Sequence, residues 1–164
     1  MIARALKEYT KAEVLEVLHP AVALWFDSRF QDLSPPQRYA VVPIHEGRNV
    51  LVTSPTGTGK TLTAFLSIIS ELLEMGERGE LQDSVYAVYV SPLRALNNDI
   101  YRNLEVPVRE IREISPNLPE IRHAVRTGDT SPSEKSKQLR RPPHILITTP
   151  ETLGIVLTAP KFRE

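Results

Sequence analysis

A glycine-rich segment in the first half of the chain has the residue types and spacing of a phosphate-binding loop. It consists of Ser54, Pro55, Thr56, Gly57, Thr58, Gly59, Lys60 and Thr61. Gly57 and Gly59 allow the backbone to curl so that successive amide N–H groups face one anion. In such a loop the lysine reaches the β- and γ-phosphates of a nucleotide, and the threonine hydroxyl binds Mg²⁺. The segment therefore predicts a nucleotide site in which Lys60 and Thr61 carry the chemistry.

The residues on either side of this loop support nucleotide binding. Residues 49–53 are expected to form a short buried strand, and residues 60–76 an amphipathic helix. The N-terminus of that helix adds a positive dipole end and free N–H donors. The loop departs from the general pattern at its first position, where Ser54 replaces glycine. A glycine-rich turn that binds nothing is the alternative, but Gly-Lys-Thr between a strand and a helix favours phosphate binding.

The segment before the loop is expected to be helical. Thr10 and Glu13 form a capping-box pattern, followed by apolar residues at helical spacing. Pro20 is expected to break or bend this first helix. A second helix is predicted over residues 34–46, because a capping serine and two prolines begin it and Gly47 follows it.

Beyond Gly47 the pattern alternates between strands and helices. Strands are expected over residues 49–53, 85–90, 121–126 and 144–148, and helices over 60–76 and 93–113 and from Pro132 and Pro150. Repeated βα units with apolar strands predict an α/β fold in which helices cover both faces of a mostly parallel sheet. We expect one domain, with residues 1–46 as an N-terminal helical segment that packs on a core formed by residues 47–164.

The composition restricts the class of protein. The 164 residues are 41% apolar and 24% charged, as in an ordinary globular domain. Basic and acidic residues balance at 20 each, so any nucleic-acid site must be a local patch. There is no cysteine, and no stretch approaches the roughly 18 apolar residues that span a bilayer. These features predict a cytoplasmic protein that does not bind membranes.

Four ordered segments resemble the motifs of superfamily 2 (DEAD/DEAH-type) helicases. They are Phe30 with Ser34-Pro35-Pro36-Gln37 ahead of the phosphate loop, Ser91-Pro92-Leu93-Arg94-Ala95-Leu96 similar to motif Ia, Thr127-Gly128-Asp129 similar to motif Ic, and Thr149-Pro150-Glu151 similar to motif Ib. The wording SPTGTGK, SPLRALNND, TGDTSPSEK and TTPETL looks most like the large helicase-related (Lhr) family. The chain thus resembles the N-terminal RecA-like domain of such a helicase, a three-layer α/β/α P-loop NTPase.

This resemblance implies roles for individual residues. Gln37 matches the Q motif, whose glutamine hydrogen-bonds adenine and so selects ATP. Phe30 either packs near the base or is a core aromatic beside a helix. Arg94, Thr127 and Thr149, together with Gly128 and Pro150, fall where these helicases hold the backbone of one nucleic-acid strand. The implied partners are single-stranded DNA, with RNA left open, and a second RecA-like domain in the full protein.

A physical argument independent of the resemblance also points to these strand ends. In open parallel α/β sheets, ligands gather at the carboxyl ends of the strands. Helices are expected to begin just after the segments at Ser91, Gly128 and Thr149, and their free N–H groups can hold phosphates without reading bases. The alternative is that these residues are only helix caps.

The acidic motif of the helicase family does not occur in the sequence. No Asp-Glu pair is present, and the chain ends at Lys161-Phe162-Arg163-Glu164, about where the family would continue to that strand. We therefore expect a motor domain truncated before the acidic motif, which binds ATP weakly but neither hydrolyses it at a useful rate nor unwinds nucleic acid. A non-catalytic ATP- or nucleic-acid-binding module and a small P-loop kinase are the alternative functions.

Overall fold

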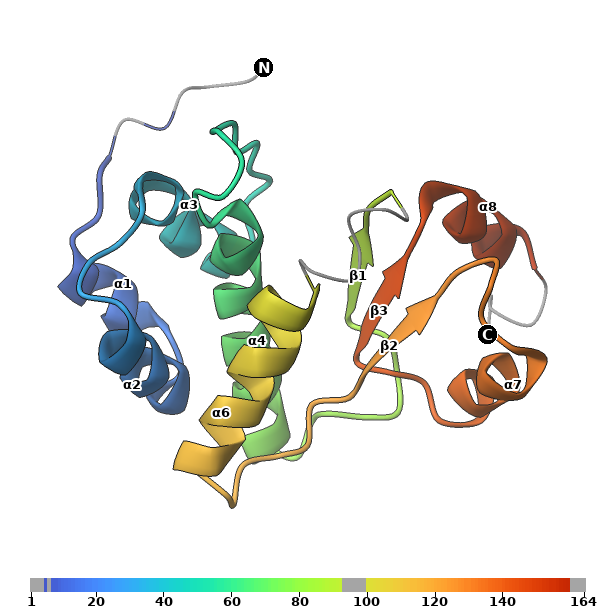
Figure 1. Ribbon diagram of the computed structural model, residues 1–164. Coiled ribbons are helices and arrows are strands. Elements are labelled where there is room, and N and C mark those ends of the chain that lie inside the picture. Colours follow the sequence, from blue (N-terminus) through green and yellow to red (C-terminus); the bar gives the residue numbers. More distant parts are fainter. Residues whose placement is uncertain (1–4, 6, 93–99, 160–164) are drawn as a thin grey trace.

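The computed structural model describes residue 5 and residues 7–92 and 100–159. The elements are α1 (Lys11–Val17), α2 (Pro20–Arg29), α3 (Pro35–His45), α4 (Lys60–Glu77), β1 (Ala87–Val90), η1 (Tyr101–Glu105), α6 (Val106–Ile114), β2 (His123–Arg126), α7 (Pro132–Arg140), β3 (Ile145–Thr148) and α8 (Pro150–Thr158). Figure 1 shows α1–α4 and α6 on one side of the sheet and α7 and α8 on the other. The expected α/β arrangement of helices around a sheet is confirmed.

The three described strands form a parallel sheet in the order β1-β3-β2. Ala87 and His123 both lie in register with Ile145, so the strands end at one common edge (Figure 1). All four residues of β3 are buried, because a strand lies on each side of it and helices cover both faces. This central position agrees with the continuous apolar sequence of β3.

One expected strand is absent from this sheet. Residues 49–53 are irregular, and none of the described strands pairs with them. Leu51 is 74% exposed and Val50 is 38% exposed, whereas a central strand would bury both. The prediction of a buried strand over residues 49–53 was therefore wrong for this structure. An apolar run becomes a strand only where another strand satisfies its backbone groups.

The helices before the loop begin where their sequence signals predict. The Thr10 N–H donates to Glu13 Oε2 at 2.8 Å, and the Glu13 N–H donates to Thr10 Oγ1 at 3.2 Å. The Thr10 N–H, followed by the Lys7 ammonium, lowers the pKa of Glu13 to about 2. Pro20 does more than bend the chain, because it begins the separate helix α2. Gly47 follows α3 with φ of 73°, a left-handed conformation that glycine adopts readily.

Helix α4 is the centre of the hydrophobic core. Phe65, Leu66 and Ile69 are at most 1% exposed and share one buried cluster with Ile145 and Ile147 of β3. Residues from α1, α2 and α3 belong to the same cluster, so the N-terminal helices and the sheet pack on opposite sides of α4. Each such side chain stabilises the fold by about 1.5–3 kcal/mol through burial.

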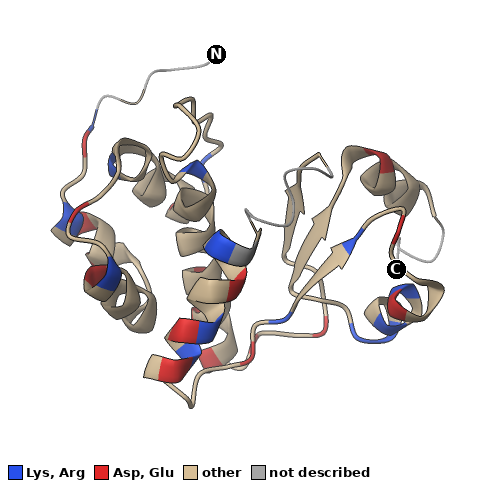
Figure 2. Cartoon of the chain, in the orientation of Figure 1, with Lys and Arg blue, Asp and Glu red and all other residues tan. Residues whose placement is uncertain are grey.

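The expected helix over residues 93–113 is replaced by two elements in its described part. Residues 93–99 lie outside the described residues, η1 is a π-helix, and α6 follows it. Pro107 has no N–H to donate, and its ring would crowd the preceding turn of an α-helix. A wider π-turn before Pro107 relieves this conflict. Figure 2 shows charged residues of both signs along α6, whereas the strands are mostly uncharged.

Gly76 provides a test of this packing. A Cβ atom at Gly76 would lie 2.4 Å from Cβ of Pro119, whereas a Cβ atom at Gly154 of α8 would meet nothing within 4 Å. Gly154→Ala should raise the free energy of unfolding by up to ~1 kcal/mol through helix propensity. Gly76→Ala should lower it by about 1–3 kcal/mol through overpacking. Urea unfolding of both variants measures this, and a stabilised Gly76→Ala protein would contradict the packing.

The buried His144 provides a second test, through pH. Burial, then the Arg122 charge, hold its pKa below the usual 6.5, and its Nδ1 accepts the Arg122 N–H at 3.3 Å. Because the unfolded chain binds a proton more readily, the free energy of unfolding should be constant above pH 6.5 and fall as pH drops below it. Urea unfolding at several pH values should show a shallower fall for His144→Asn. An equally steep fall in that variant would disprove the assignment.

Candidate functional site

The phosphate-type loop lies at the N-terminus of α4. Gly59 is the N-cap residue of α4, with φ of 86°, and Gly57 has φ of 80°. Both values are in the left-handed region, which side chains with a Cβ atom rarely adopt. The two glycines therefore turn the chain sharply enough for the loop to end directly on the free N–H groups of α4.

The side chains of the loop bond to its own backbone. Nζ of Lys60 donates to the carbonyl oxygens of Ser54 at 2.5 Å and Pro55 at 2.7 Å. The Thr58 hydroxyl lies 2.6 Å from the Ser54 hydroxyl and donates to the Pro55 carbonyl at 2.8 Å. Lys60 is half-buried and held inside the curve of the loop. A phosphate oxygen in the loop would take the place of these carbonyl acceptors.

Gln37 lies against this loop. Its side chain is 4% exposed, and its Oε1 accepts the Ser34 N–H at 2.8 Å. A Cβ atom at Gly59 would lie 3.4 Å from Nε2 of Gln37 and 3.2 Å from Oγ of Ser34. The start of α3 and the start of α4 therefore approach so closely that only glycine fits comfortably at position 59.

A cavity of 390 Å³ connects these residues with two further elements. It is lined by Trp25, Arg29, Phe30, Asp32, Ser34, Gln37, Gly57, Thr58, Gly59, Leu62, Arg102, Asn103 and Val106. Its volume lies within the range of about 300–1,000 Å³ that is usual for small-molecule sites. The sequence motifs identified Phe30, Gln37 and the loop, but they gave no indication that Arg29 and Arg102 would face the same space.

Phe30 packs on aromatic residues of α2 and also lines the cavity. Its ring centroid lies 4.7 Å from that of Phe26 and 5.9 Å from that of Trp25, in a tilted and an edge-on arrangement. The side chain is 36% exposed and lines the cavity. Phe30 therefore packs on the buried aromatic residues of α2 with one part of its ring and faces the cavity with another.

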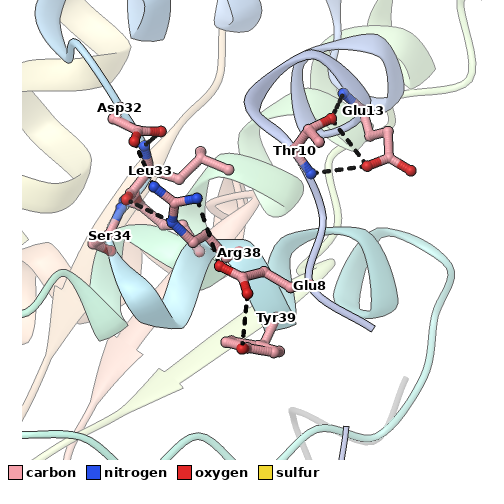
Figure 3. A network of polar contacts seen from close by, with 9 residues as sticks. Glu8, Thr10, Glu13, Asp32, Leu33, Ser34, Arg38 and Tyr39 are labelled. Atoms are coloured by element: carbon pink, nitrogen blue, oxygen red, sulfur yellow. Dashed lines mark hydrogen bonds and ion pairs between the residues drawn. The ribbon is translucent and has the colours of Figure 1, made fainter. Parts of the chain in front are cut away.

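A polar network fixes the loop that precedes Gln37 (Figure 3). The Arg38 guanidinium pairs with Asp32, donates to the Leu33 carbonyl at 3.3 Å and lies 3.6 Å from a Glu8 carboxylate oxygen. The Leu33 N–H, followed by the Arg38 charge, lowers the pKa of Asp32. Arg38 thereby ties residues 32–33 and the N-terminal segment to α3. The sequence motifs did not identify this network.

The predicted strand-end residues lie side by side but are buried. Arg126 and Thr148 are in register, so Thr127 and Thr149 follow directly on neighbouring strands. Thr127 is 6% exposed and Thr149 is 5% exposed, whereas Gly128 and Pro150 are exposed. Oγ1 of Thr149 accepts the Thr152 N–H at 3.4 Å, which makes it the cap of α8. The expected Arg94 lies outside the described residues.

The strand end also buries an arginine that the motifs did not identify. Arg126 is 8% exposed, and its Nη1 donates to Gln138 Oε1 at 3.3 Å. Burial lowers the pKa of its guanidinium. The Thr148 hydroxyl donates to the Arg126 carbonyl at 2.7 Å. These contacts join β2, β3 and α7 beneath the exposed strand-end loops.

No helix in the described ranges has the length and apolar character needed to cross a membrane.

Comparison with known proteins places the chain among helicases. A model of the DEAD/DEAH box helicase family matches residues 34–164. The ATP-dependent helicase Lhr-Core protein 2 of Thermococcus barophilus is 60% identical over 100% of the chain and 20% of its own length. ATP-dependent helicase Lhr-Core of Methanothermobacter thermautotrophicus is also 60% identical, over 100% of the chain and 19% of its own length. The chain thus spans about a fifth of these curated relatives.

Solved structures agree with this result. The helicase Lhr of Mycobacterium smegmatis bound to ssDNA and AMP-PNP superposes with a TM-score of 0.78 and 38% identity, over 90% of this chain and 19% of that one. The DEAD-box helicase Mss116 bound to ssRNA and UDP-BeF gives a TM-score of 0.72 and 25% identity, over 96% of this chain and 31% of that one. The similarity to RecA-like helicase domains and to Lhr proteins is confirmed.

Proposed function

Because the chain belongs to the DEAD/DEAH box helicase family, we propose that it is the ATP-binding part of motor domain 1 of an ATP-dependent nucleic-acid helicase. The observation that carries the proposal is the single cavity lined by both Gln37 and Gly57–Gly59. A base-recognising amide and a phosphate-binding loop at one cavity match the two ends of a nucleotide. In the full protein, a second RecA-like domain would complete the motor.

The loop and α4 would bind the phosphate groups. The N–H groups of residues 57–61 and the α4 N-terminus supply donors, and Lys60 would exchange the Ser54 and Pro55 carbonyls for phosphate oxygens. This exchange requires little movement, because the ammonium already lies within the loop. Binding by this part of the chain is therefore a local replacement of hydrogen-bond acceptors.

Mg²⁺ would enter with the nucleotide. Within residues 7–92 and 100–159 no group of three or more His, Asp or Glu side chains could hold a metal ion. The half-buried Thr61 hydroxyl follows Lys60 at the start of α4 and is the protein ligand that the loop provides. Mg²⁺ suits such a site because it keeps several waters and binds largely through substrate phosphates. When bound, it neutralises charge on those phosphates.

Gln37 would select adenine. Its Oε1 accepts the Ser34 N–H, which fixes the amide plane and leaves a second lone pair, and Nε2 keeps its donors on the Gly59 side. An amide with one donor and one acceptor complements the amino group and N7 of adenine. Guanine carries an acceptor oxygen in place of that amino group, so it would place an acceptor against the second lone pair of the Gln37 oxygen.

The strand-end loops would hold the backbone of a single nucleic-acid strand. The buried Thr127 and Thr149 side chains place the exposed Gly128 and Pro150 at the common edge of the sheet. Backbone groups at this edge suit sequence-independent contact with phosphates. Single-stranded DNA is the first candidate, since the M. smegmatis Lhr structure contains ssDNA, and RNA is the second, since the Mss116 structure contains ssRNA.

Nucleotide binding tests the main proposal. Calorimetric titration of residues 1–164 with ATP and Mg²⁺ should show binding that Lys60→Ala weakens by at least about tenfold, because a charge-assisted contact to phosphate is lost. Lys137→Ala on the exposed face of α7 is the control and should bind ATP as the parent chain does. Folded parent protein that binds no ATP, or equal binding by Lys60→Ala, would refute the phosphate site.

Base selection tests the role of Gln37. The ratio of GTP to ATP dissociation constants should fall at least about fivefold in Gln37→Ala, since one hydrogen bond to a neutral base contributes about 0.5–1.5 kcal/mol and an unpaired buried group costs more. Tyr39→Phe, an exposed change on the same helix, is the control. Competition titrations provide both constants. An unchanged ratio in Gln37→Ala with ATP still bound would rule out this role.

A further inference from the structure

A cation that none of the helicase motifs includes lines the nucleotide cavity. Arg102 lies in η1 and faces the cavity together with Asn103 and Val106. Its side chain is exposed. The same lining includes Gly57, Thr58 and Gly59 of the phosphate loop. A guanidinium group is thus directed to the same space as the loop.

The Arg102 guanidinium has no partner among the described residues, whereas its neighbours are paired. Arg29, on the cavity wall, pairs with Glu110 at 2.7 Å, and Arg109 of α6 pairs with Glu113 at 3.7 Å. No such ion pair or hydrogen bond engages Arg102 anywhere in residues 7–92 and 100–159. A positive charge left unpaired beside a phosphate loop is available to an anionic ligand.

Helix α6, which directly follows the η1 turn that carries Arg102, is held by hydrogen bonds to α2. Trp25 Nε1 donates to one Glu110 carboxylate oxygen at 2.8 Å, and Arg29 Nη2 donates to the other at 2.7 Å. Glu110 of α6 thus clamps the α6 wall of the cavity to α2. The π-helical turn of η1 ends at Glu105, and α6 follows it directly, with Pro107 in its first turn. Arg102 therefore lies directly before a helix that is fixed to α2.

The contacts of η1 and α6 show which elements lie beside Arg102 at the cavity. Towards its C-terminus α6 packs on α2. Trp25 of α2 and Phe30, which directly follows α2, are the aromatic residues of the cavity lining. At the other end η1 packs on α4, whose first turn contributes Leu62 to the cavity lining. Arg102 precedes Glu110 by about two helical turns, or roughly 10 Å. Arg102 is thus set apart along the chain from Glu110, the residue of α6 that binds Trp25.

We propose that Arg102 contacts the phosphate groups of the bound nucleotide, as a second cation in addition to Lys60. This inference rests on the proposed ATP site and assigns one more residue to it. The planar fork of a guanidinium binds two phosphate oxygens at once, in contrast to the single point charge of Lys60. The loop and η1, which line the same cavity, then hold the phosphates together.

The test compares ATP binding by Arg102→Gln, Arg102→Lys and a matched control, Arg109→Gln. Arg109 is an exposed arginine of α6 that does not line the nucleotide cavity. Calorimetry at several potassium chloride concentrations should show about tenfold weaker ATP binding for Arg102→Gln. The loss of affinity with rising salt should also be shallower, because one ionic contact is missing. Arg102→Lys should recover part of the affinity, and Arg109→Gln should stay within about twofold of the parent.

Each outcome separates this inference from the ATP site itself. If Lys60→Ala loses ATP while Arg102→Gln binds it as the parent does, the site stands and the Arg102 contact is overturned. Weaker binding of Arg102→Gln with an unchanged salt dependence also overturns it, since the arginine would then stack on the base. A parent chain that binds no ATP removes the proposed function and this inference together. Thermal unfolding confirms that each variant is folded. If Arg102→Gln does not fold, the ATP affinity of Arg102→Lys is the result that counts.

Discussion

The close approach of the first turns of α3 and α4 is the constraint on which the site depends. Gly59 faces Ser34 and Gln37 at distances that leave no free room for a side chain. The approach is maintained by apolar packing along α4 and by the Ser67 hydroxyl, which donates to the Val41 carbonyl at 3.2 Å. In the proposed nucleotide site, the Gln37 amide and the phosphate loop could contact one nucleotide only while the distance between them is fixed. Packing far from the ligand therefore sets the geometry of binding.

The remaining walls of the cavity depend on contacts that join distant parts of the chain. Glu110 binds Trp25 and Arg29 across 85 and 81 residues of sequence, and Arg38 links Asp32 and Glu8. In both networks a charged side chain orients a segment that would otherwise be held only by its apolar neighbours. Charge-assisted hydrogen bonds are directional, so they specify positions that hydrophobic burial alone leaves loose.

The sequence predicted the parts of the structure that local signals determine. The capping box at Thr10, the start of α3 and the glycine-rich loop at α4 all depend on residues a few positions apart. The run at residues 49–53 was misjudged, because strand formation requires a partner that local sequence does not reveal. The contributions of Arg29 and Arg102 to the cavity were missed for the same reason. Their position follows from packing between α2, η1 and α4, and no short motif encodes it.

The strand-end loops show that helix capping and phosphate contact need not exclude each other. In α8, Pro150 has no N–H, Thr149 Oγ1 accepts the Thr152 N–H, and the Leu153 N–H bonds to the Thr149 carbonyl. Among the backbone N–H groups of residues 151–153, only that of Glu151 has no acceptor among the described residues. Helix α7 has the same arrangement: Pro132 has no N–H, and the N–H groups of Glu134 and Lys135 donate to the Ser131 hydroxyl and carbonyl. Only the Ser133 N–H is left without an acceptor among the described residues. In the proposed function, each helix thus has one backbone amide available to bind a phosphate. The acidic side chain in the first turn of each helix, Glu134 in α7 and Glu151 in α8, would repel that phosphate. In the proposed function, these two contacts would hold a nucleic-acid strand weakly and independently of its sequence.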